Sequence, residues 1–74
     1  MASDYQHRSL LTVREREIFH LLVSDHSTKQ ISEKLSISEK TVRNHISNTI
    51  QKLGVSGRSQ AIIELLRLGE LSLD

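Results

Sequence analysis

Residues 27–53 constrain the fold more than any other part of the chain, because they carry the signals of two short helices joined by a very short turn. Ser27 followed by Gln30 predicts a capping box, in which each side chain bonds the other residue's backbone amide at the start of a helix. Ser38 predicts the cap of a second helix. Gly54 predicts the end of that helix, because glycine readily adopts the left-handed backbone found there. The segment therefore predicts a helix-turn-helix.

The predicted second helix, over about residues 39–53, has two contrasting faces on a wheel of about 100° per residue. The apolar face, which we expect to meet the core, consists of Val42, Ile46, Thr49, Ile50 and Leu53. Only one acid, Glu39, lies on the polar face, in the first turn, where the helix dipole favours a negative charge. The remaining polar residues are Lys40, Asn44, Ser47, Asn48 and Gln51, with Arg43 at one edge and Thr41, His45 and Lys52 at the other.

The chemistry of this polar face suits a DNA duplex. Arginine can bond guanine and asparagine can bond adenine through paired hydrogen bonds, while cationic and hydroxyl flanks suit the phosphates beside a groove. The simplest alternative is an ordinary solvated face, but amide, hydroxyl and cationic groups dominate this one. The other alternative is a protein-docking module, which would be expected to carry aromatic or aliphatic anchors in place of Arg43, Asn44 and Ser47. The pattern therefore favours DNA binding.

Charge is distributed unevenly along the chain, whose net charge is only +1. Residues 28–58 hold six cationic residues against two acids, a balance of +4. The remainder holds four cationic residues against seven acids, a balance of −3. Chance clustering can produce such a split in a short chain, but the basic part coincides with the predicted helix-turn-helix, as the electrostatic footprint of a nucleic-acid binder should.

Length and composition exclude several other classes. Seventy-four residues allow one domain, and the absence of cysteine excludes disulfides and thiolate metal sites. No two histidines are spaced as a metal pair on a helix, and no apolar run approaches the roughly 18 residues of a membrane span. The polar start is unlike a signal peptide. We therefore expect a cytoplasmic protein with no cofactor, no metal and no membrane contact.

Enzyme chemistry is not indicated either. The sequence has no glycine-rich phosphate loop and no nucleophile with a suitably spaced base. Asp25, His26 and Ser27 contain the residue types of a catalytic triad, but sequence neighbours do not meet as a triad does. They lie at a helix boundary, where Asp and Ser are common caps. We therefore expect a binding protein and not an enzyme.

Two further helices are predicted around this motif. Thr12 and Glu15 predict a capping box for a helix that runs to about Val23, with its inward stripe formed by Leu11, Ile18, Phe19 and Leu22. Glu15 also falls within that stripe, so a bond to a basic group of a neighbouring helix is possible besides its capping role. Residues 1–9 are expected to be a flexible tail before a domain over residues 10–74.

The last helix is predicted over about residues 58–69, capped by Gly57 or Ser56. Its core-facing apolar side is expected to be Ala61, Ile62, Leu65 and Leu68. Ile63 and Leu66 form a second apolar side, together with Ser59 and Glu70. A lone exposed apolar residue needs no explanation, but two at this spacing on a terminal helix indicate an interface.

Five short motifs follow one another along residues 10–70. They read Leu11-Thr12-x-Arg14-Glu15-x-Glu17-Ile18, Lys29-x-Ile31-x-x-x-Leu35-x-Ile37-Ser38, Thr41-Val42-Arg43-Asn44-His45-Ile46, Lys52-Leu53-Gly54-Val55 and Arg58-Ser59-Gln60-Ala61. In this order they resemble the LuxR/FixJ/NarL-type helix-turn-helix family. The resemblance implies an all-α, four-helix domain that binds double-stranded DNA as a homodimeric transcription regulator. It is strongest to free-standing members that control late sporulation genes, including spore coat genes, and it implies action on the nucleoid of the mother cell. RNA polymerase is a further possible partner, and no small-molecule ligand is evident.

The same resemblance assigns roles to particular residues. The base-reading positions would be Arg43, Asn44 and Ser47, with Lys40 and Asn48 as lesser candidates. The phosphate contacts would be Thr28, Lys29, Ser38, Thr41, His45, Lys52, Arg58 and Ser59. The dimer interface would lie on the last helix, at Ile63, Leu66, Arg67 and Glu70. The wheel agrees for Thr41, His45 and Lys52, which share one flank of the predicted recognition helix.

Overall fold

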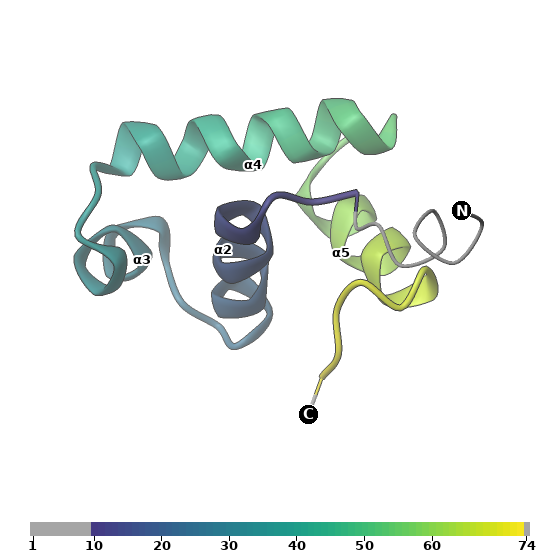
Figure 1. Ribbon diagram of the computed structural model, residues 1–74, viewed down its shortest axis with the longest axis horizontal. Coiled ribbons are helices and arrows are strands. Elements are labelled where there is room, and N and C mark those ends of the chain that lie inside the picture. Colours follow the sequence, from purple (N-terminus) through teal and green to yellow (C-terminus); the bar gives the residue numbers. More distant parts are fainter. Residues whose placement is uncertain (1–9, 74) are drawn as a thin grey trace, which may run out of the picture.

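The computed structural model of the chain describes residues 10–73, so the tail predicted at 1–9 lies outside the described residues. Within that range the chain forms four helices and no strand, which confirms the predicted all-α, four-helix class. The helices are α2 (Val13–Val23), α3 (Thr28–Leu35), α4 (Glu39–Leu53) and α5 (Arg58–Arg67). The long helix α4 lies along one side of the domain, with α2 below its middle and α3 and α5 on opposite flanks (Figure 1).

Side-chain caps begin the first three of these helices where the sequence predicted them. Thr12 and Glu15 form a capping box at α2, with the Glu15 amide 3.1 Å from the Thr12 hydroxyl and the Thr12 amide 2.9 Å from the carboxylate. Ser27 and Gln30 form the same arrangement at α3. Ser38 caps α4 by accepting the third backbone amide of that helix. These local bonds satisfy amides that a helix start otherwise leaves unpaired.

Left-handed residues end α3 and α4, so the chain turns sharply between them and after them. Gly54 has φ +69° at the end of α4, and both its amide and that of Val55 donate to the carbonyl of Ile50. Val55 thereby folds back and packs against the core. Ser36 performs the same role after α3 with φ +57°, although it is not a glycine. The turn between the two helices is consequently only three residues long.

A single core joins all four helices. Phe19, Ile18, Ile31 and Val42 are fully buried, and α4 presents to the core the apolar face that its sequence predicted. Thr49 is also fully buried, and its hydroxyl donates to the carbonyl of His45 one turn earlier. A buried hydroxyl satisfied within its own helix adds no unpaired polar group to the core. Within residues 10–73, the buried apolar residues are Leu11, Ile18, Phe19, Ile31, Val42, Ile46, Ala61, Leu65 and Leu71.

The end of α5 departs from the sequence prediction. We expected the helix to continue to Gly69 with Leu68 facing the core, but α5 ends at Arg67 and Leu68 is 44% exposed. Gly69 then adopts φ +76°, which reverses the chain. Leu71 fills the core position instead, and the amides of residues 70 and 71 donate to the carbonyl of Leu65. A left-handed glycine thus replaces the predicted last helical turn with a reversed stretch, residues 69–72, which we call the fold-back segment.

The outward side of α5 is narrower than predicted. Ile63 is 61% exposed, as its assignment to a second apolar side required. Leu66, assigned to the same side, is half-buried and packs against the core, so that assignment was wrong in part. The buried side of α5 is therefore wider than the wheel indicated, since it includes Leu66 beside Ala61, Ile62 and Leu65. Ile63 alone keeps the fully outward position predicted for the pair.

Candidate nucleic-acid interface

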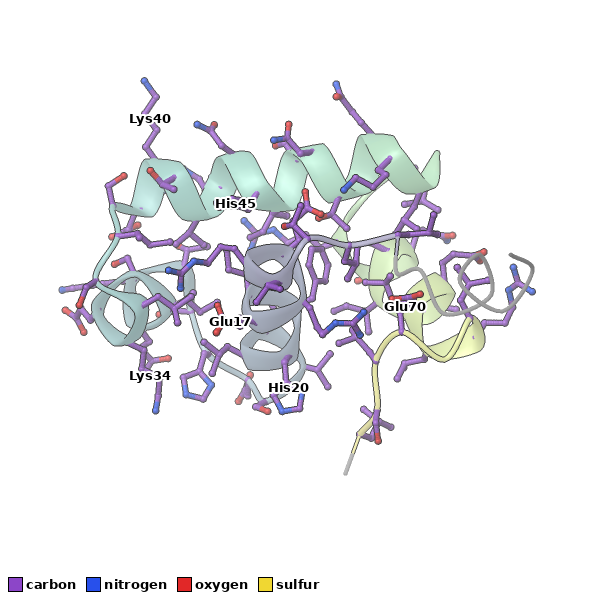
Figure 2. All side chains as sticks on the ribbon, in the orientation of Figure 1. Glu17, His20, Lys34, Lys40, His45 and Glu70 are labelled. Carbon is purple, nitrogen blue, oxygen red and sulfur yellow. The ribbon has the colours of Figure 1, made fainter. Side chains whose placement is uncertain are left out.

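The outer side of α4 is a continuous polar surface. Figure 2 shows Lys40 extending from α4 away from the other helices. Val42, Ile46 and Thr49, on the opposite side of α4, are buried, so packing against the core fixes which way the polar side points. The exposed residues of this surface, which we call the outer face of α4, are Lys40, Arg43, Asn44, Ser47, Asn48 and Gln51. The structure therefore brings all five predicted base-reading residues onto one accessible face.

Predicted phosphate contacts lie at the starts of α3 and α4. Lys29 is exposed in the first turn of α3, and Ser38 is exposed at the cap of α4. The Ser38 hydroxyl accepts the Thr41 amide at 3.0 Å and donates to the Thr41 hydroxyl at 2.9 Å. This pair fixes two hydroxyl groups beside the amides of a helix amino terminus, where anions are stabilised. His45 is half-buried on the same flank of α4, and Arg58 and Ser59 are exposed at the start of α5.

One acid stands among these polar groups. The Glu39 carboxylate pairs with the Arg43 guanidinium, with Nη1 and Oε1 3.2 Å apart. The same carboxylate oxygen accepts a long hydrogen bond of 3.4 Å from the Thr28 hydroxyl of α3. From the sequence we expected Glu39 only to interact with the helix dipole. Its spacing of four residues from Arg43 is a signal for the ion pair, whereas nothing in the sequence signals the contact with Thr28.

Lys52 forms a second ion pair, with a carboxylate of the core. Its ammonium lies 2.6 Å from Glu15 Oε1, and the Glu15 side chain is 5% exposed against 33% for Lys52. Burial raises the pKa of the Glu15 carboxyl, but hydrogen bonds from Lys52 and from the Thr12 amide outweigh it, so the pKa lies below its usual value. The possible bond between Glu15 and a neighbouring basic group is thus confirmed. The Lys52 ammonium is already paired with Glu15, so a phosphate contact at Lys52 would have to share the ammonium with Glu15 or break this pair.

The predicted dimer positions have mixed surroundings. Arg67 pairs with Glu64 on the exposed surface of α5, and this hydrogen bond lowers the pKa of the Glu64 carboxyl. Glu70 lies beyond the helix end, and its carboxylate is 2.8 Å from the guanidinium of Arg16 on α2. Sequence reasoning missed this pair, because 54 residues separate its members. Ile63 remains the exposed apolar group among the four positions.

A groove of about 580 Å³ lies on the other side of the domain, between α2, α3 and the fold-back segment. Figure 2 places Glu17, His20, Lys34 and Glu70 on this side, away from α4. Leucine side chains and the pair between Arg16 and Glu70 line the groove. Within residues 10–73, no three histidine, aspartate or glutamate side chains gather in a way that could hold a metal ion. None of the helices in that range has the length and apolar character needed to cross a membrane.

Comparison with known proteins agrees with this geometry. Residues 9–65, more than half of the chain, match the model of a family described as bacterial regulatory proteins, luxR family. The chain is 67% identical over 70 residues to the spore germination protein GerE of Bacillus subtilis (strain 168), with 95% of each chain covered. It is 47% identical over 60 residues to the transcriptional regulatory protein DegU of Brevibacillus brevis. That match covers 81% of this chain but 25% of the DegU protein.

A solved structure extends the likeness to three dimensions. The structure described as that of the transcription factor GerE is 86% identical in sequence and superposes with a TM-score of 0.88. The match covers 90% of this chain and 100% of the other. The four-helix arrangement is therefore that of a known transcription factor.

Proposed function

The chain belongs to the luxR family of bacterial regulatory proteins, and from this premise we propose that it recognises specific operator sequences as a homodimer. Like its family, it is a DNA-binding transcription regulator and not an enzyme. The observation that carries the proposal is the outer face of α4, where cationic, amide and hydroxyl groups are exposed on a helix whose opposite side is fixed in the core. Such a helix can enter the major groove without any change in the fold.

In this proposal the outer face of α4 reads the bases. Arg43, Asn44 and Ser47 would make the principal contacts, and Lys40 and Asn48 the lesser ones. Arginine and asparagine each offer the paired hydrogen bonds that distinguish guanine and adenine in the major groove. The absence of exposed apolar anchors on this face of α4 favours a duplex over a protein partner.

Phosphates on both walls of the groove would hold α4 in register. The amino termini of α3 and α4 carry several of the proposed contacts, where backbone amides and hydroxyl groups gather. His45 and Lys52 lie along one flank of α4. The complete proposed set is Thr28, Lys29, Ser38, Thr41, His45, Lys52, Arg58 and Ser59.

Two copies would pair through α5. Ile63 would lie at the centre of this contact, with Leu66, Arg67 and Glu70 around it, because Ile63 is the most exposed apolar residue of that helix. The contact is small, so we expect a dimer of micromolar affinity or weaker in the absence of DNA. Two half-sites about one helical turn apart, or a multiple of it, would hold the copies together. RNA polymerase would be a further partner of the DNA-bound dimer.

The relative named spore germination protein suggests which genes are regulated. We propose that this chain controls late sporulation genes, including those of the spore coat. It would then act in the cytoplasm of the mother cell, bound to the nucleoid. Transcript profiles of sporulating cells with and without the gene test this assignment, because late coat transcripts should change while early sporulation transcripts should not.

Selection of bound sites from random duplexes tests the DNA-binding proposal directly. We expect an enriched half-site that occurs twice with two-fold symmetry and a fixed spacing. Recovery of no enriched sequence would overturn specific recognition. Recovery of a single unpaired half-site would leave recognition intact but overturn the homodimer.

A further inference from the structure

We infer that Glu39 is a specificity-determining residue, which acts by holding Arg43 and by opposing contacts to phosphate. This inference rests on the proposed DNA-reading role of α4. It gives an acidic residue a part in DNA recognition beside the cationic and polar residues. The Glu39 carboxylate contacts two proposed DNA-binding groups at once, the Arg43 guanidinium at 3.2 Å and the Thr28 hydroxyl at 3.4 Å. It therefore lies between a base-reading group and a phosphate-binding group.

The ion pair has little value as a stabilising interaction. The side chains of Arg43 and Glu39 are 55% and 41% exposed, and exposed pairs four residues apart on a helix contribute little to folding. A carboxylate on a surface that approaches phosphates also weakens binding by repulsion. Repulsion by Glu39 therefore weakens binding to every duplex to some degree, and the helix dipole, which favours an acid in this first turn, does not account for its pairing with Arg43.

The explanation lies in how Arg43 behaves on the wrong sequence. An arginine with no matching base can turn to the phosphate backbone and strengthen binding to any DNA. The pair with Glu39 gives its guanidinium another partner and keeps it directed along α4. On the right sequence, Arg43 can bond a base through its other N–H groups while Nη1 keeps its contact with Glu39, so the ion pair need not be broken there. Glu39 thus weakens non-specific binding more than operator binding, which is specificity gained through repulsion.

A charge-neutral variant separates these effects. Glu39→Gln keeps an acceptor oxygen for Thr28 but removes the charge. We expect it to tighten binding to an unrelated duplex of equal length by roughly three- to tenfold, with a salt dependence steeper by about one unit of slope. Binding to the duplex selected by the wild-type protein should tighten by a smaller factor, about twofold, because only the repulsion is removed there. Equal changes on both duplexes, or loss on the selected duplex alone, would overturn the inference.

Two further variants identify the cause. In an Arg43→Ala background, Glu39→Gln should no longer alter the ratio of the two affinities, because the proposed effect passes through Arg43. An undiminished effect in that background would contradict the mechanism. Glu33→Gln is the matched control, since Glu33 is an exposed acid of α3 that borders a pocket with Lys34 on the side away from α4. Glu33→Gln should leave the ratio of the two affinities unchanged. An effect equal to that of Glu39→Gln would show that Glu39 acts only through its negative charge and not through Arg43.

Failure of this inference and failure of the proposed function give different results. If selection with the wild-type protein enriches no duplex, the DNA-reading role itself is wrong. If selection succeeds and Glu39→Gln leaves the affinity ratio unchanged, only the role of Glu39 is wrong. Thermal melts of each variant establish that it is folded before its affinity is compared.

Discussion

Replacing Glu15 with glutamine should destabilise the domain far more than the same change at Glu17, two residues further along α2. Glu15 is 5% exposed and pairs with Lys52, whereas Glu17 is half exposed and pairs with an exposed arginine. Breaking a buried ion pair costs about 3–5 kcal/mol, and breaking an exposed one costs about 0.2–1 kcal/mol. Lys52 keeps a third of its side chain exposed, and glutamine can still accept the Thr12 amide, so the expected cost is intermediate.

We expect Glu15→Gln to lower the free energy of unfolding by about 1–2 kcal/mol at pH 7. For a domain of this size that loss corresponds to a fall in melting temperature of roughly 5–15 °C. Glu17→Gln should lower it by less than about 0.5 kcal/mol. Thermal and urea unfolding followed by circular dichroism measure both values.

The effect should also depend on pH with a defined sign. The pKa of Glu15 is lower in the folded chain than its ordinary value of 4.5, so the unfolded chain binds this proton more tightly. The stability that the pair contributes is therefore fully present above the ordinary value and is lost as pH falls through the lower folded value. The difference between wild type and Glu15→Gln should shrink over that acidic range. A difference that stays constant down to full protonation, or equal losses for Glu15→Gln and Glu17→Gln, would refute this reasoning.

Three other outcomes follow from the surface and from the chain reversals. Arg43→Ala should reduce the free energy of binding to the selected duplex by about 1–3 kcal/mol and relax the preference at one base position. Lys29→Ala should instead weaken binding to all duplexes alike and reduce the slope of the salt dependence by about one. Filter-binding titrations measure both effects. Ile63→Glu should reduce binding to a duplex with two half-sites steeply and leave a single half-site nearly unchanged; equal losses on both would place Ile63 in the monomer instead. Gly69→Ala should cost about 1 kcal/mol because its φ is +76°, while Gly57→Ala, at an extended φ with open space around it, should change stability by less than about 0.5 kcal/mol in urea unfolding.

Local signals explain why so much of the fold was predictable. Thr12, Ser27 and Ser38 each precede their capping partner by three residues, so the start of a helix is specified within one turn of sequence. The two faces of α4 follow from its helical period, which is also local. The helical period alone therefore suffices to place the candidate base-reading residues on one face.

Contacts between distant segments were predicted less well. The position of Glu15 in an apolar stripe indicated a basic partner, but the choice of Lys52 depends on how α2 crosses α4. The wheel assigned Leu68 to the core because it assumes a helix that continues, whereas the reversal at Gly69 brings Leu71 there. The sequence shows that residue 69 is a glycine. It does not show in which direction the chain continues after that glycine, because this direction depends on packing against the core.

The pair between Arg16 and Glu70 has a consequence for the kinetics of folding. Capped helices can form early from contacts a few residues apart, but this pair closes a separation of 54 residues and fastens a segment beyond the last helix. Such a contact is expected to form after the transition state, with a φ-value near zero. Loss of the pair should then speed unfolding while the folding rate stays nearly constant. The pair would therefore lengthen the lifetime of the folded molecule and have little influence on how quickly it first assembles.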